Sequence, residues 1–510
     1  MSLREQAIRG AFWSGIQNWG SALLGAGVFI VLARTLDTKS FGLLALAALV
    51  VNFMEIFLRQ GFGQAIVQRQ ELETGHLDTA FWMNVVGAIV MTLVAVTGGG
   101  LIAAAFHEPD LSRVIRWLSL SLLIGALNAT PQALLQRRMM FKSLAIRSLV
   151  AVAGGGVVGI TMALTGCGVW SLVGQHLTAA GIGTVVLWTA SGFRPGLNVS
   201  RRHFRDLFGF GVYIIGADLL AFLTQRWDRL VIGLFLSTQA VGFYDVAQRL
   251  LTVMTQVLTQ TLSTVAFAAF SRLQQEKEQM RHALYTTTRL TSAIAFPAFL
   301  GMAVLAPELV RGLFGPGWEP SIPVMRVLAL VGILQSVGFL TGGVMLACGK
   351  PSWRLAIMVL NLVVNVAAML LAVRWGILAV AAAYAIRGFL LWPLSIAAVR
   401  ILIGVDPRAY LQSLTAPLVA SLVMVAAVAA VQYALGGRGA VFLTLAAGIM
   451  VGALTYVLAV YLLAPDLAGQ VQELFRAARR GGTVGETATP LGNLNTTNGP
   501  EYAQEPNQRR

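Results

Sequence analysis

Six charged side chains lie within residues 207–250, a stretch that is mostly apolar and long enough to cross a bilayer twice. They are three aspartates and three arginines, namely Asp218, Arg226, Asp228, Arg229, Asp245 and Arg249. A charged side chain at the centre of a membrane-spanning helix costs about 2.5–3.5 kcal/mol on insertion scales. The last five would together cost on the order of 12–18 kcal/mol if all lay deep and unpaired. Charges retained at this cost are candidates for a functional site.

Two arrangements could offset the cost. Asp245 and Arg249 are spaced i, i+4, so they could pair on one face of a helix. Pairing would still leave three arginines against two aspartates between Arg226 and Arg249, which is one cation in excess. The excess favours a water-filled cationic cavity, and structural pairing near the membrane interface is the alternative.

Three further charged residues lie inside or at the end of apolar runs. Glu55 and Arg59 are spaced i, i+4 and could form a self-contained pair. Arg387 lies within AAAYAIRGFLLW with no acid on its own helix, so it must face a partner helix, water or an anionic ligand. We therefore predict that the cavity residues that bind substrate are Arg226, Asp228, Arg229, Arg249 and Arg387. The residues predicted to pair with them or to take part in coupling are Glu55, Arg59, Asp218 and Asp245.

No pattern of catalytic or cofactor chemistry accompanies these charges. The five histidines are scattered and lack the spacing of metal ligands. The segment 343–352 departs from a phosphate-binding loop by one extra residue and by a proline at the hydroxyl position. We predict no enzyme activity, no metal and no cofactor. His176, inside an apolar run, is more typical of a packed or water-contacting side chain than of a proton relay.

The composition indicates a polytopic membrane protein. The hydrophobic fraction is 56%, the charged fraction is 12% and the mean hydropathy is +0.73, all far from the averages of soluble domains. A net charge of +15 could suit nucleic acid, but the cations lie in short breaks between apolar runs, so we predict no nucleic-acid partner. Two cysteines in 510 residues exclude a disulfide scaffold.

Fourteen apolar runs are each long enough to cross about 30 Å of hydrocarbon. With the N-terminus inside, about 25 Lys and Arg lie on the cytoplasmic side and about 8 outside, so both termini are predicted to be cytoplasmic. We predict an all-α protein with a short interfacial helix, two lobes of six spans, two extra spans and a largely disordered cytoplasmic tail. These parts are, in order, residues 1–12, 13–200, 201–400, 401–465 and 466–510.

The two predicted lobes repeat each other with a shift of 200 residues. The segment FIVLARTLDTKSFGLLALA, residues 29–47, aligns with VIGLFLSTQAVGFYDVAQ, which places Gly42 on Gly242. The segment FLRQGFGQAI, residues 57–66, aligns with VLTQTLSTVA. A repeat of six spans preserves orientation, so the lobes should be related by an axis along the membrane normal, with a site between them.

Local signatures along residues 1–410 together resemble one family. The first half contains LARTLDTKSFGLLALA, QGFGQAIVQRQELETGHLDTAFWMN, PQALLQRRMMFKSLAIRS and GCGVWSLVGQ. The second half contains WDRLVIGLFLSTQAVGFYDVAQRL, AFAAFSRLQ and LFGPGWEPSIPVMRVLAL. Their order and spacing resemble the polysaccharide transporter branch of the multidrug/oligosaccharidyl-lipid/polysaccharide exporter superfamily, the bacterial O-antigen and exopolysaccharide flippases. The resemblance implies a MATE-like, two-lobed helical fold in the bacterial cytoplasmic membrane, with a central cavity that alternates between the two faces.

The same resemblance implies a substrate. It is an undecaprenyl-pyrophosphate-linked oligosaccharide repeat unit, flipped to the periplasmic leaflet for exopolysaccharide, capsule or O-antigen synthesis. Membrane lipids are expected partners, and polysaccharide polymerase and export machinery are further candidates. Lipid II flippases of this superfamily use cavity arginines on the first, second and eighth spans. Arg249 matches the eighth, whereas the first span has no internal arginine and Glu55 occupies the second.

Three alternatives stay open. A MATE-type drug/cation antiporter would favour acidic over basic cavity residues, whereas a pyrophosphate requires arginine donors. A membrane glycosyltransferase, polymerase or ligase would need a sizeable loop with acid/base residues, and the predicted outer loops are short. The third alternative is a non-transporting membrane component of a polysaccharide assembly complex.

Overall fold

The computed structural model describes residues 3–59, 62–68, 72–435, 441–466 and 469, and every regular element in this part of the chain is a helix. The first eight are α1 (Leu3–Thr35), α2 (Thr38–Arg59), α3 (Phe62–Gln68), α4 (Thr74–Ala105), α5 (Pro109–Leu118), α6 (Leu120–Arg137), α7 (Phe141–Leu164) and α8 (Val169–Ser191). They are followed by α9 (Arg201–Phe235), α10 (Thr238–Arg272), α11 (Lys277–Val304), α12 (Ala306–Phe314), α13 (Ser321–Ala347), α14 (Pro351–Ala372), the 3₁₀ helix η1 (Val373–Trp375), α15 (Ile377–Ile403), α16 (Pro407–Leu435) and α17 (Val441–Leu463).

Eleven segments of this part of the chain are long and apolar enough to cross a membrane, and α5 and α6 together form one of them. Helices α8, α9 and α10 have 23, 35 and 35 residues, which also suffices to span about 30 Å of hydrocarbon. The prediction of an all-α polytopic membrane protein is confirmed. Residues 3–12, predicted as part of an interfacial helix, continue without a break into the first span, because α1 is one helix. The predicted tail lies almost entirely outside the described residues.

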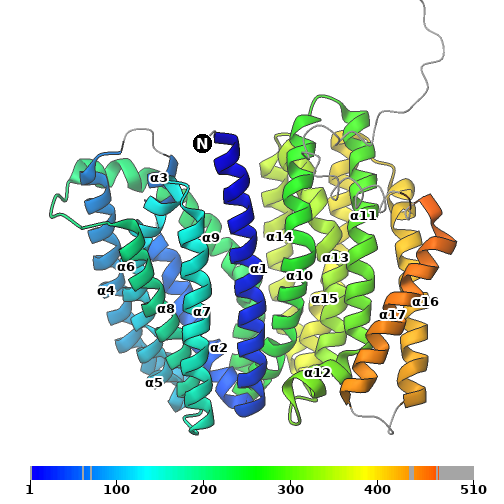
Figure 1. Cartoon of the computed structure of the whole chain (residues 1–510), viewed down its shortest axis with the longest axis horizontal. Helices are drawn as coiled ribbons and strands as arrows, with labels where there is room; N and C mark the ends of the chain where they lie inside the picture. The colour runs from blue at the N-terminus through cyan, green and yellow to red at the C-terminus, as the bar shows by residue number, and fades with distance from the viewer. Residues whose placement is uncertain (1–2, 60–61, 69–71, 436–440, 467–468, 470–510) are drawn as a thin grey trace, which may run out of the picture.

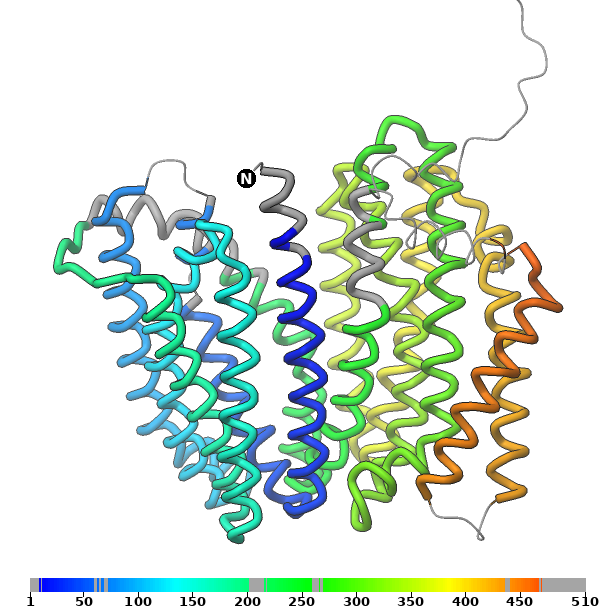
Figure 2. The backbone as a smooth tube through the Cα atoms, in the orientation of Figure 1, coloured from blue at the N-terminus to red at the C-terminus, as the bar shows by residue number. Residues whose placement is uncertain are grey.

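The long helices form two groups (Figure 1). Helices α2 to α8 lie on one side and α10 to α17 on the other, and α1 runs between them, as the tube in Figure 2 also shows. Helix α1 packs against α7 and also contacts α10 and α12, whereas α9 contacts α2 and α4 of the first group and α10 and α14 of the second. Helices α1 and α9 therefore connect the two groups.

The turns that follow α1 and α9 are built alike. Helix α1 ends and α2 begins at positions that lie 200 residues before the end of α9 and the beginning of α10. Asp37 accepts a hydrogen bond from the backbone N–H of Ser40 at 3.3 Å, and Ser237 accepts one from the N–H of Ala240 at 3.1 Å. Aspartate and serine are preferred N-cap residues because they satisfy free N–H groups of the first turn. The same local chemistry thus starts α2 and α10.

Helices α2 and α10 cross in close contact at two glycines. A Cβ atom on Gly42 would lie 1.8 Å from the carbonyl oxygen of Thr238, and one on Gly242 would lie 2.3 Å from the carbonyl oxygen of Thr38. The contacts are reciprocal, because each glycine meets the threonine that begins the opposite helix. Only glycine leaves room for such a close approach of two backbones.

Further contacts close the end of the bundle opposite the N-terminus, where α12 lies in Figure 1. The indole N–H of Trp318 donates to the carbonyl oxygen of Ala33 at 2.9 Å, and its ring lies 5.4 Å from that of Phe41. Arg34 donates to the carbonyl oxygen of Leu313 at 2.8 Å, a favourable position because helix C-termini carry partial negative charge. The end of α1 and the beginning of α2 are therefore held against α12 and the loop that follows it.

Candidate functional site

A cavity of about 390 Å³ lies between α1 and α2 on one side and α9 and α10 on the other, with α7 and α8 completing its wall. Its charged and titratable lining residues are Arg226, Arg229, Asp245, Arg249 and His176. Neutral polar groups of Ser21, Asn52, Gln175 and Thr252 also line it. The three arginines and the aspartate come from α9 and α10, and the histidine comes from α8, so the charged lining residues are confined to the α9–α10 side.

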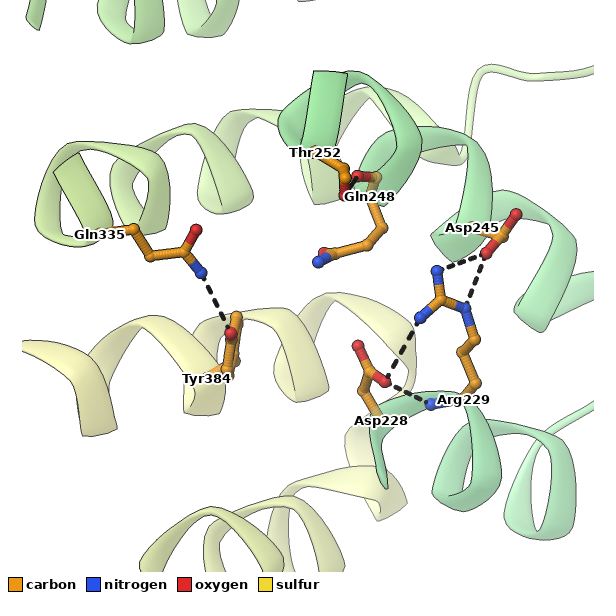
Figure 3. A network of polar contacts seen from close by, with 7 residues as sticks. All are labelled: Asp228, Arg229, Asp245, Gln248, Thr252, Gln335 and Tyr384. Carbon is orange, nitrogen blue, oxygen red and sulfur yellow. Dashed lines mark hydrogen bonds and ion pairs between the residues drawn. The ribbon is translucent and has the colours of Figure 1, made fainter. Parts of the chain in front are cut away.

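Arg229 is a buried and compensated cation (Figure 3). Its Nε and one terminal nitrogen lie 2.7 and 2.6 Å from Oδ1 of Asp245, and the other terminal nitrogen lies 3.9 Å from Oδ1 of Asp228. The side chains of Arg229 and Asp228 are only 8% and 7% exposed. Asp245 therefore pairs with an arginine of the neighbouring helix, not with Arg249 on its own helix. This triad holds α9 against α10, with Asp228 behind the cavity wall.

Arg226 and Arg249 are the two cavity arginines that are not neutralised by an acidic side chain of the described residues. Within the described residues neither forms an ion pair or a side-chain hydrogen bond, and both line the cavity. Arg249 is exposed to it and reaches α1, where its guanidinium lies 5.8 Å from the centre of the Phe29 ring and close to Gly25. Arg226 is half-buried and lies three residues before Arg229, on the same side of α9. Two guanidinium groups are thus available to a ligand.

Arg387 and Asp218, both predicted at the site, do not line this cavity. Arg387 is 9% exposed, lies 4.6 Å from the centre of the Tyr384 ring and donates to the carbonyl oxygen of Asn361 at 3.4 Å. The Tyr384 hydroxyl in turn accepts a hydrogen bond from Gln335 at 3.3 Å (Figure 3). A cation over an aromatic face is stabilised by the ring quadrupole, so Arg387 is held inside the second helix group. Asp218 is half-buried on α9, more than two turns from Arg226.

His176 is a cavity residue to which the sequence analysis assigned no functional role. Its side chain is exposed to the cavity, and the carboxylate of Glu55 on α2 is near enough to interact with it electrostatically. The adjacent polar residues Gln175 and His176 inside an apolar run were the signal that could have identified it. The side chain of Arg59 lies outside the described residues, so the predicted pair of Glu55 with Arg59 stays a prediction.

The arrangement is suited to an anion held between the two helix groups. Guanidinium groups bind phosphate oxygens through paired hydrogen bonds, and such charge-assisted bonds are strong where water is partly excluded. Arg226 and Arg249 present this chemistry from α9 and α10, and Asn52 of α2 and Gln175 of α8 line the same cavity with neutral amide side chains. No group of three His, Cys, Asp or Glu that could hold a metal ion occurs in the described part of the chain.

Comparison with known sequences identifies relatives over most of the chain. A protein-family model described as "Polysaccharide biosynthesis protein" matches residues 31–323. The lipopolysaccharide biosynthesis protein WzxC of Escherichia coli (strain K12) is 29% identical over 353 residues, which cover 68% of this chain and 71% of WzxC. The probable low-salt glycan biosynthesis flippase Agl15 of Haloferax volcanii is 25% identical over 404 residues, which cover 76% of this chain and 81% of Agl15.

Comparison with solved structures identifies the fold. The lipid II flippase MurJ, in an inward closed conformation, matches with a TM-score of 0.74 at 13% identity, covering 90% of this chain and all of that chain. An inward-facing multidrug resistance MATE family transporter of the MOP superfamily matches with a TM-score of 0.58 at 15% identity, covering 77% of this chain and 96% of that chain. At these identities the similarity is one of fold, and the predicted MATE-like fold is confirmed.

Proposed function

This chain belongs to the polysaccharide biosynthesis family of membrane flippases, as its sequence signatures predicted, and from this premise we propose that it flips undecaprenyl-pyrophosphate-linked oligosaccharides across the cytoplasmic membrane. The family is one of transporters and not of enzymes. The products would be repeat units for exopolysaccharide, capsule or O-antigen synthesis. The observation that carries the proposal is the presence of two arginines without acidic partners, Arg226 and Arg249, in a cavity between the two helix groups.

The chemistry of the substrate fits the two walls of the cavity. Its diphosphate would bind Arg226 and Arg249, because planar guanidinium groups match phosphate oxygens and stay charged in a partly dehydrated site. Arg229, which also lines the cavity, would add little positive potential, because Asp245 and Asp228 neutralise most of its charge. The neutral amides of α2 and α8 would hydrogen-bond the sugars. The polyprenyl tail would stay in the bilayer while the polar headgroup crosses.

We further propose fourteen spans that form two lobes of six, residues 13–200 and 201–400, with α16 and α17 as an added pair. Three features support an internal repeat: equivalent helix ends 200 residues apart, N-caps at Asp37 and Ser237, and the reciprocal contacts of Gly42 and Gly242. Reciprocal contact is what a two-fold axis between α2 and α10 produces. An axis along the membrane normal relates parallel repeats in transporters and places the substrate between them.

The cavity would work by alternating access. Its closed end is the end opposite the N-terminus, where α2 crosses α10 and Trp318 binds Ala33. The distribution of Lys and Arg assigns the N-terminal end to the cytoplasm, so the substrate would enter from the cytoplasmic leaflet. Separation of α2 from α10, together with the release of α12 from the end of α1, would open the cavity to the periplasm.

Deletion of the gene followed by lipid analysis tests the function. Accumulation of a sugar-linked polyprenyl diphosphate in the cytoplasmic leaflet is the expected result, whereas loss of the synthesis of that lipid would indicate a transferase. Complementation with Arg226→Ala or Arg249→Ala should fail to restore polymer export while the protein reaches the membrane in normal amount. Arg116→Ala is the matched control, because this exposed arginine lies on α5 and does not line the cavity. Restored export by both cavity variants would overturn the proposed site.

A drug/cation antiporter on the same fold is disfavoured by the charge of the cavity. Arginines outnumber carboxylates among its lining residues, and the one lining aspartate is already bonded to Arg229. Uptake of a cationic dye into vesicles by the purified protein would support the antiporter. No dye uptake, together with lipid accumulation in the deletion strain, is the result expected of the flippase.

A further inference from the structure

A second cavity, of about 290 Å³, lies between α11 and α16 and shares no residue with the arginine cavity. Polar side chains line much of it: His282, Tyr285, Thr286 and Arg289 from α11, and Gln412 and Ser413 from α16. It lies towards the end of the bundle that carries the N-terminus, where α11 and α16 begin (Figure 1). We call it the α11–α16 pocket.

The α11–α16 pocket is cationic. Arg289 is half-buried in it and, among the described residues, has no ion pair and no side-chain hydrogen bond. No Asp or Glu lines the pocket, and two acids near the beginnings of α11 and α16 are engaged elsewhere. Glu278 forms an ion pair with Arg281, and the carboxylate of Asp406 accepts a hydrogen bond from the backbone N–H of Arg408 at 3.0 Å. The pocket therefore has positive charge without an internal counterion.

The α11–α16 pocket also lies where a lipid headgroup would meet the protein. Arg289 is twelve residues into α11, about 18 Å along a helix that spans the membrane. On other faces of the same two helices apolar side chains are exposed, with Ile294 48% exposed on α11 and Leu411 and Leu418 45% and 38% exposed on α16, so both helices lie at the periphery of the bundle. Apolar side chains exposed on a membrane-spanning bundle face acyl chains.

From these observations we propose that the α11–α16 pocket binds the phosphate of an anionic membrane phospholipid. The guanidinium of Arg289 forms the charge-assisted hydrogen bonds to the phosphate, with the Thr286 hydroxyl and the Gln412 amide as additional donors. His282 lies exposed at the mouth of the pocket and adds a ring N–H donor. The acyl chains extend from the pocket into the bilayer around these peripheral helices. Basic pockets between membrane helices bind lipid headgroups in this way.

Native mass spectrometry of the full chain, released from nanodiscs of phosphatidylglycerol and phosphatidylcholine, tests this proposal. The wild type should retain phosphatidylglycerol, and Arg289→Gln should weaken its binding by at least about fivefold, since one cation near the membrane surface contributes about 1 kcal/mol. Arg289→Lys should retain part of the binding, because it keeps the charge. Arg408→Gln is the matched control, since Arg408 is exposed at the start of α16 and does not line the pocket, and it should bind like the wild type.

Four results would overturn the proposal. Undiminished lipid retention by Arg289→Gln would remove the role of the arginine, and an equal loss in Arg408→Gln would indicate only diffuse surface charge. Displacement of the lipid by millimolar inorganic phosphate would assign the pocket to a free anion. Photo-crosslinking of the wild type with a diazirine-bearing phosphatidylglycerol locates the lipid without relying on any variant. Crosslinks on α11 and α16 support the site, and crosslinks confined to other helices contradict it.

Discussion

Replacing Gly42 with alanine should open the closed end of the cavity. The added Cβ would lie 1.8 Å from the carbonyl oxygen of Thr238, whereas such atoms essentially never approach within 3.0 Å. The obstacle is backbone and cannot rotate away, so α2 and α10 must separate by about 1.2 Å or more. Overpacking of this kind costs about 1–3 kcal/mol. If that cost falls on the closed state alone, the ratio of closed to open molecules drops by about 5- to 150-fold.

Cysteine labelling measures this shift. In a background without the native thiols of Cys167 and Cys348, a cysteine at Leu44, which lines the cavity, reacts with a membrane-impermeant maleimide added on the periplasmic side only when the closed end opens. Gly42→Ala should raise the labelling rate towards that of an open cavity. Gly242→Ala should act in the same direction, since its Cβ would lie 2.3 Å from the carbonyl oxygen of Thr38.

The matched control is Gly27→Ala on α1, because a Cβ at Gly27 meets nothing within 4 Å. This variant should label like the parent. Unchanged labelling in Gly42→Ala, at a normal amount of membrane-inserted protein, would refute the assignment of the crossing as a closure. Loss of folded protein would also contradict it, since the crossing would then be needed for folding and not for the change of state.

The remaining predictions concern the arginines and the topology. Arg249→Lys should restore only part of polymer export relative to Arg249→Ala, because lysine keeps the charge but loses the paired hydrogen bonds to a diphosphate; equal export by the two variants would exclude such bonds. Arg229→Ala should reduce the amount of folded protein, since removing one partner of a buried ion pair costs about 3–5 kcal/mol, and thermal denaturation of the purified protein measures the loss. An Arg229→Met, Asp245→Leu double variant should recover most of that stability, and a further loss would show that the pair is not the cause. Reporter fusions after Gly168 and Arg480 should read periplasmic and cytoplasmic, and the reverse pattern would invert the orientation assigned by Lys and Arg.

The class of fold and the family follow from the sequence alone. Apolar runs of 20 or so residues can only be helices in a membrane, because a bilayer leaves no partner for unsatisfied backbone groups. The 200-residue shift, although the similarity is weak, correctly aligned Gly42 with Gly242, the two glycines of the helix crossing. The excess of arginine over aspartate between Arg226 and Arg249 was also visible, since charge is a property of composition.

Which charges are neutralised and which face the cavity depends on how the helices pack against one another. Asp245 is i, i+4 from Arg249, yet it bonds Arg229, because the packing of α10 against α9 brings that guanidinium within 2.6 Å. Arg387 has no acid on its own helix, and for that reason it was predicted to face the cavity. In the structure its guanidinium contacts the ring of Tyr384 and a carbonyl of the neighbouring α14 instead. His176 was predicted to be a packed or water-contacting residue, and in the structure it lines the same cavity as the arginines. The sequence does not specify this position, because the helices packed against α8 determine which of its faces points into the cavity. Spacing along one helix restricts which side chains share a face, whereas partners across helices are fixed only when those helices come together.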